Sequence, residues 1–159
     1  MKLEVLCLVA SFLFANVTWA DSQERPNLTG VWRLDPSKCE IHSHVAPELT
    51  WQIEQSDNEI HLIRRLGDNK NAGEWRCGTD GKDCKVKDEG HSAVVSYYYN
   101  GQVLVELESE GSNRDTITKK RISVSKDGSL ITVDVIHVLP QGMPPEKLVL
   151  SKQPATDSH

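Results

Sequence analysis

Residues 92–109 read SAVVSYYYNGQVLVELES, two runs rich in β-branched and aromatic residues on either side of Asn100-Gly101. Asn-Gly favours a two-residue type I′ turn, because both central positions need a positive φ. The turn therefore predicts a hairpin that pairs Tyr98 with Val103. The apolar face, which we expect to point inward, carries Val94, Ser96, Tyr98, Val103, Val105 and Leu107. The mixed face, which we expect to meet water, carries Ala93, Val95, Tyr97, Leu104, Glu106 and Glu108.

Asp127-Gly128 predicts a second hairpin by the same turn chemistry. Counting outward from this turn pairs Val124 with Ile131 and Ile122 with Val133, so that apolar residues meet on one face. A one-residue slip would move the apolar residues of one strand to the opposite face. The pattern therefore supports this register.

Asp57-Asn58 predicts a third hairpin, which pairs Ile53 with Leu62 and Trp51 with Arg64. Arg64 thus falls on an apolar face, where its guanidinium can stack on the Trp51 indole or meet an anionic group of a ligand. The alternative is an arginine at the barrel rim, with its stem over the indole and its charged end in water.

The whole pattern predicts ten strands and no long helix. Sequential hairpins with one apolar face each are best closed as a single antiparallel up-and-down barrel, because closure removes exposed sheet edges. A two-sheet sandwich is the alternative fold. The expected strands are residues 28–34, 49–55, 59–66, 73–77, 84–87, 92–99, 102–109, 115–124, 129–139 and 147–152.

The first twenty residues have the pattern of an export signal. Lys2 precedes an apolar run at residues 5–14, and Thr18-Trp19-Ala20 offers small residues at both positions that a signal peptidase reads. We therefore expect a signal peptide at residues 1–20, a barrel domain at residues 21–153 and a flexible tail at residues 154–159. The predicted location is periplasmic or secreted.

The charge balance limits the partners. The 159-residue chain has a formal net charge of −5. Nucleic acids and anionic membranes need clustered Lys and Arg on their partners, so neither is expected. We expect no membrane span after signal cleavage, and a monomer.

Three cysteines follow the signal: Cys39, Cys77 and Cys84. Asp80-Gly81 lies midway between the last two and predicts a hairpin that places them opposite each other. Opposed residues in an antiparallel pair are close enough for a disulfide. We expect a Cys77–Cys84 bond and a free Cys39, the alternatives being a bond to Cys39, a redox pair or a metal site.

Several short motifs resemble small exported bacterial proteins of the lipocalin-like, calycin-type barrel class. Gly30-Val31-Trp32 resembles the first-strand G-x-W of lipocalins, and residues 34–38, 80–82 and 124–133 extend the resemblance along the chain. The resemblance implies a barrel in which Gly30 and Trp32 are structural and Trp32 closes one end. It also implies a ligand-binding role, without naming a ligand.

Catalytic and cofactor signatures are absent from the sequence. It contains no G-x-S-x-G, H-E-x-x-H, P-loop or G-x-G-x-x-G motif, so neither an enzyme nor a cofactor is expected. His42 and His44, with Cys39 nearby, could hold a metal, but two solvated histidines are the simpler interpretation and no metal site is expected.

Three functions are consistent with this pattern. The first is a barrel that binds a small apolar or amphipathic ligand through Trp51, Arg64 and Tyr98. The second is an envelope interaction or inhibitor protein with a filled core that acts through its loops. The third is a catalytic lipocalin-like barrel. Interior volume separates the first from the second, and a buried polar cluster is required for the third.

Overall fold

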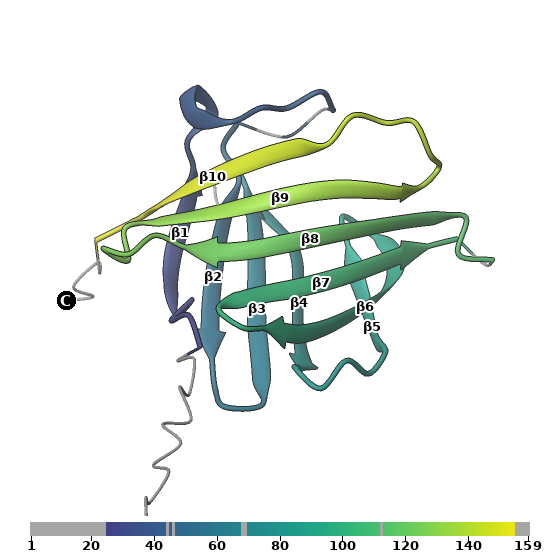
Figure 1. Ribbon diagram of the computed structural model, residues 1–159, viewed down its shortest axis with the longest axis horizontal. Helices are drawn as coiled ribbons and strands as arrows, with labels where there is room; N and C mark the ends of the chain where they lie inside the picture. The colour runs from purple at the N-terminus through teal and green to yellow at the C-terminus, as the bar shows by residue number, and fades with distance from the viewer. Residues whose placement is uncertain (1–24, 44, 46, 68–69, 112, 155–159) are drawn as a thin grey trace, which may run out of the picture.

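The computed structural model describes residues 25–154, except residues 44, 46, 68, 69 and 112. Ten antiparallel strands close into one barrel, and sequential strands are neighbours throughout (Figure 1). A short 3₁₀ turn, η1 (Pro36–Lys38), follows the first strand. The strands are β1 (Gly30–Leu34), β2 (Thr50–Gln55), β3 (Glu59–Leu66), β4 (Lys70–Gly78), β5 (Cys84–Asp88), β6 (His91–Asn100), β7 (Val103–Glu110), β8 (Thr116–Val124), β9 (Leu130–Leu139) and β10 (Glu146–Lys152).

The fold prediction is confirmed, and the sandwich alternative is wrong. β1 pairs with β10, which closes the sheet and leaves no free edge at the chain ends. Figure 1 shows that β1–β4 run steeply across β8–β10, so the barrel is flattened into two crossing layers. The predicted signal peptide lies outside the described residues.

Two of the predicted hairpin registers are observed. β8 and β9 pair Val124 with Ile131 and Ile122 with Val133. β2 and β3 pair Trp51 with Arg64, as the Asp57-Asn58 turn predicts. Local turn chemistry therefore sets these registers before any long-range contact is considered.

The hairpin at Asn100-Gly101 was predicted incorrectly in two respects. β6 and β7 pair Tyr98 with Val105, not with Val103, because Asn100 joins the ladder opposite Val103. The inward face was also reversed, since Tyr97 and Leu104 are buried in the core. Successive strand residues point to opposite faces, so Tyr98 lies on the outer face.

The core fills one end of the barrel, called here the filled end. Trp32 is completely buried there, and its indole N–H donates to the backbone carbonyl of Leu28 at 2.8 Å. The ammonium group of the exposed Lys152 lies 5.1 Å from the centre of the Trp32 ring. Other apolar side chains that complete this end are Ile53, Ile60, Leu104, Ile122, Ile131 and Leu150.

Candidate functional site

A cavity of about 210 Å3 lies inside the barrel, and the part of the interior that it occupies is called here the open end. Trp51, one of its lining residues, is the register partner of Trp32, so the cavity begins next to the packed core. Strand alternation explains its position, because Trp51, Arg64, Lys120 and His137 continue the inward rows of β2, β3, β8 and β9 beyond the apolar core. Half of the lining residues are apolar, and all but one of the others are ionisable. Its side chains are Val45, Leu49, Trp51, Leu62, Arg64, Trp75, Glu106, Glu108, Thr118, Lys120, Val135, His137, Glu146 and Leu148.

Two neighbouring glutamates hold a lysine in the cavity wall. Lys120 Nζ lies 2.6 Å from Glu106 Oε1 and 2.5 Å from Glu108 Oε2. The β7–β8 register places Glu106 directly opposite Lys120. Burial opposes the charge of Lys120, but the two carboxylates raise its pKa above the ordinary value. Burial likewise disfavours ionised Glu108, and Lys120 nevertheless lowers the pKa of that carboxyl. The triad of Glu106, Glu108 and Lys120 therefore holds the Lys120 ammonium between two carboxyl groups.

Arg64 is the second cation of the lining. Its guanidinium pairs with Asp88 of β5 and lies 3.7 Å from a carboxylate oxygen of Glu89. The side chain is 18% exposed, so it is neither fully buried nor a solvated rim residue. The sequence predicted its neighbour Trp51 but not these acidic partners, which come from a different hairpin.

Glu146 ties the long β1–β2 connection to the cavity wall. Its Oε1 accepts the backbone N–H of His42 at 2.9 Å and also that of Ser43, and its Oε2 accepts the Ser43 hydroxyl at 2.9 Å. Burial would raise the pKa of this carboxyl, but these donors hold it below the ordinary value. Val45, from the same connection, lines the cavity. This connection therefore covers part of the open end.

Among the residues that the structure describes, several buried polar atoms beside the cavity have no hydrogen-bond partner. They include Trp51 Nε1, Arg64 Nε, Asp88 Oδ1 and His137 Nε2. Trp51 is only 4% exposed. An unpaired buried donor costs about 1 to 3 kcal/mol. Four such atoms around one cavity are the feature expected where a polar ligand group or water completes the bonding.

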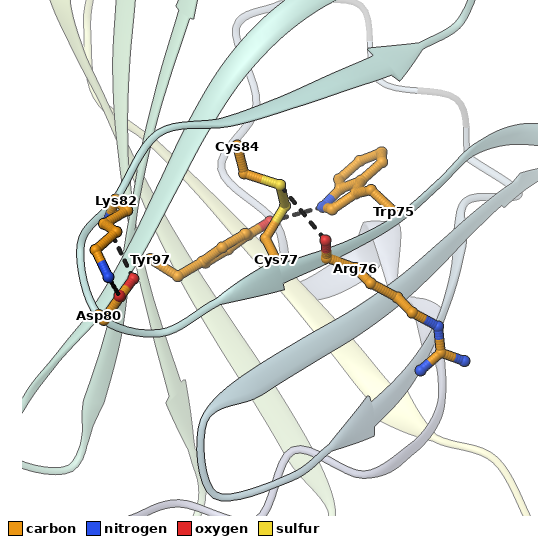
Figure 2. The surroundings of a disulfide bond; sticks show 7 residues. All are labelled: Trp75, Arg76, Cys77, Asp80, Lys82, Cys84 and Tyr97. Atoms are coloured by element: carbon orange, nitrogen blue, oxygen red, sulfur yellow. Dashed lines mark hydrogen bonds and ion pairs between the residues drawn. A yellow bond between two sulfur atoms is a disulfide. The ribbon is translucent and has the colours of Figure 1, made fainter.

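Tyr97, not Tyr98, is the tyrosine of the interior. Its hydroxyl accepts the Trp75 indole N–H at 3.0 Å, and the side chain is 1% exposed (Figure 2). Burial raises the pKa of Tyr97 well above its usual range, and the nearby Glu106 carboxylate adds to the rise. Tyr98 does not line the cavity. Trp51 and Arg64, the other two predicted ligand-binding residues, are brought together there.

The wall between β4 and β5 is the most weakly paired part of the barrel. These strands share one paired position, Gly73 with Asp88. A Cβ atom at residue 73 would come within 2.7 Å of the Trp75 ring, so glycine is required for this close approach. A surface groove of about 860 Å3 lies over the seam, and Trp75 lines both this groove and the inner cavity.

The predicted disulfide joins Cys77 to Cys84 across this seam, with the two Cα atoms 5.8 Å apart (Figure 2). The pairing of the two cysteines is as predicted, but the type I′ turn is not. Gly81 has a φ of +79°, whereas Asp80 has no positive φ and instead forms a bridge with Tyr98 of β6. The bond therefore connects β4 and β5 where few hydrogen bonds do.

Cys39 is a free, half-buried thiol. Its sulfur accepts the Val149 backbone N–H at 3.2 Å and donates to the Asp35 carbonyl at 3.1 Å. Within the described part of the chain, no group of three or more His, Cys, Asp or Glu side chains is placed to hold a metal. His44 lies outside that part, so the alternative of a site with His42 and His44 stays open.

The sequence interpretation missed most of the polar lining: Glu106, Glu108, Lys120, His137 and Glu146. Glu106 and Glu108 were assigned to water because a mixed face usually is solvated. Strand alternation carried a signal, since both glutamates share a face with Leu104 and Tyr97. Their counterion comes from the next hairpin, and no local pattern reveals it.

Comparisons with known proteins show the fold. No protein-family model and no curated protein matches the chain. A secretary abundant heat soluble protein from Ramazzottius varieornatus is similar in structure at a TM-score of 0.64 and 11% identity, covering 83% of this chain and 99% of that one. Lipid binding protein 8 of Caenorhabditis elegans has a TM-score of 0.58 at 9% identity, covering 79% and 94%.

A third solved structure, the REP1-NXSQ fatty acid transporter, has a TM-score of 0.58 at 10% identity and covers 81% of this chain and 98% of that one. At these identities, the likeness establishes a shared barrel architecture. None of the helices in the described part of the chain is long and apolar enough to span a membrane. By fold, the chain is similar to β-barrel proteins that include a lipid binding protein and a fatty acid transporter.

Proposed function

We propose that this protein binds a small amphipathic molecule in the open end of its barrel. The observation that carries the proposal is the cavity of about 210 Å3 with unpaired polar atoms on Trp51, Arg64 and His137 in its lining. A filled interior would have left neither the volume nor the unused hydrogen-bonding capacity. The names of two similar barrels, a lipid binding protein and a fatty acid transporter, support the same class of function.

The size of the cavity limits the ligand. Pockets for drug-sized ligands usually measure about 300 to 1,000 Å3. This cavity is smaller, so the ligand is a short molecule or one whose tail leaves the barrel. Leu49, Leu62 and Leu148 supply the apolar contacts, and the ionisable groups face the polar end of the ligand.

The proposal includes export. The Cys77–Cys84 bond supports it, because stable disulfides form in oxidising compartments. The mature protein would therefore act as a periplasmic or secreted, monomeric carrier that binds its ligand without chemical change.

Calorimetric titration of the purified protein with C6 to C10 aliphatic alcohols tests the proposal. We expect saturable one-to-one binding. Leu148→Phe fills the cavity and should weaken binding at least tenfold, whereas Ile136→Phe adds the same ring at a position 38% exposed and should leave binding unchanged. Equal binding by wild type and Leu148→Phe, with both folded by circular dichroism, would contradict an interior site.

A further inference from the structure

The charges of the cavity point to the class of ligand. The lining holds two permanent cations, Arg64 and Lys120, and three carboxylates, those of Glu106, Glu108 and Glu146. Arg64 also pairs with Asp88. Even a protonated His137 leaves the carboxylates in excess.

Both cations are already engaged by more than one carboxylate. Lys120 contacts Glu106 and Glu108, and Arg64 contacts Asp88 and lies near Glu89. An anionic head group would have to displace one of these partners and would then lie among the remaining carboxylates. Charges interact strongly where water is excluded, so this arrangement disfavours an anion.

The unpaired donors argue against a cation. The indole N–H of Trp51 and the Nε–H of Arg64 are both buried and lack an acceptor. Neither group can accept a hydrogen bond. An ammonium group only donates, so it would leave both donors unpaired. A neutral oxygen accepts from them without adding charge.

We propose that the cavity selects an uncharged, oxygen-bearing head group, such as an alcohol, amide or ester, and rejects carboxylates. This inference rests on the proposed function and narrows it. A hydroxyl or amide hydrogen can in addition donate to Asp88 Oδ1 or to His137 Nε2, which also lack partners. The ligand class therefore differs from the one in the name of the fatty acid transporter of similar fold.

The test compares three eight-carbon probes at pH 7.5 by calorimetry: 1-octanol, octanoate and octylammonium. We expect 1-octanol to bind at least tenfold more tightly than either charged probe. Octanoate or octylammonium binding as tightly as 1-octanol would overturn the inference while leaving the proposed function intact. Binding by none of the three would overturn both.

Two pairs of variants identify the groups responsible. Glu108→Gln removes a lining charge and should raise octanoate affinity at least fivefold, whereas Glu40→Gln makes the same change at an exposed position and should not. Trp51→Phe should weaken 1-octanol binding about fivefold, which corresponds to one hydrogen bond. In Trp32→Phe the lost N–H bonds to the Leu28 carbonyl instead, and Trp32 does not line the cavity, so the preference for 1-octanol over octanoate should persist. Unchanged probe preference in Glu108→Gln would overturn the electrostatic argument.

Discussion

The filled end and the open end of the barrel are built by the same strands but from different chemistry. At the filled end, Trp32, Ile131 and Leu150 are completely buried, and the one indole N–H among them has an acceptor. At the open end, buried Glu106 pairs with half-buried Lys120 beside a cavity, and several polar atoms of the described residues lack partners. The comparison teaches that one end is closely packed, whereas the other has the cavity and the unpaired polar atoms on which the proposed ligand site rests.

The largest expected effect separates the two ends by stability. Trp32→Ala should lower the free energy of unfolding by about 3 to 5 kcal/mol, because it leaves a large hole in a packed core. Trp51→Ala should cost at least about 1 kcal/mol less, because the indole already borders a cavity. Urea denaturation at pH 7 measures both. Equal losses would show that the ends do not differ in packing.

Lys120→Met should destabilise the protein at the open end, because it removes the positive charge between two glutamates. Removing one partner of a buried ion pair costs about 3 kcal/mol or more, because the two glutamates are left unneutralised. Their pKa values would then rise above those in the unfolded chain, so the variant should gain stability as the pH falls from 7 to 5. The wild type should not, because Glu108 has a lowered pKa and loses its contribution as pH falls through it. If the stability of the variant and of the wild type changed with pH in the same way, Lys120 would not be the group that neutralises the two glutamates.

The seam between β4 and β5 adds a third region to the comparison of the two ends, because few backbone pairs join these strands along their whole length. Replacing both Cys77 and Cys84 by alanine should cost about 2 kcal/mol, as expected for a short closed loop. Amide exchange should accelerate along β5, which shares one paired position with β4. Cys39→Ala, which removes a free thiol, is the control. Faster amide exchange confined to β1 and β10 would contradict the claim that the disulfide stabilises the seam.

The smallest expected effect on stability concerns His61, which points to the outer face of the barrel but is covered by its neighbours. Its ring nitrogens lie 2.9 Å from Glu54 and from Glu74, and the bond to Glu54 raises its pKa above 6.5 despite opposing burial. A raised folded-state pKa stabilises the protein fully below pH 6.5, and this contribution is lost as the pH rises through the folded value. The stability difference between wild type and His61→Gln should therefore be larger at pH 6 than at pH 9. A difference that is independent of pH would contradict the assignment.

Much of the fold could be predicted from local sequence, because turn dipeptides and strand alternation act over short distances. The Trp51–Arg64 pair follows from the turn beside it. The Cys77–Cys84 bond was also predicted correctly, although the type I′ turn expected at Asp80-Gly81 does not form. The site was harder to predict. Glu106 resembles a solvated residue until β8 brings Lys120 opposite it, and that pairing depends on the register of another hairpin.

The most direct test of the central claim is a two-dimensional 15N NMR titration of the indole N–H groups with 1-octanol. Trp51 and Trp32 are register partners on β2 and β1, but only Trp51 lines the cavity. Among the described residues, the Trp32 N–H has an acceptor and the Trp51 N–H has none. We predict a saturable shift of the Trp51 signal with the Trp32 signal unmoved. A Trp51 signal that does not respond while 1-octanol binds, or an equal shift of both signals, would contradict a ligand site at the open end.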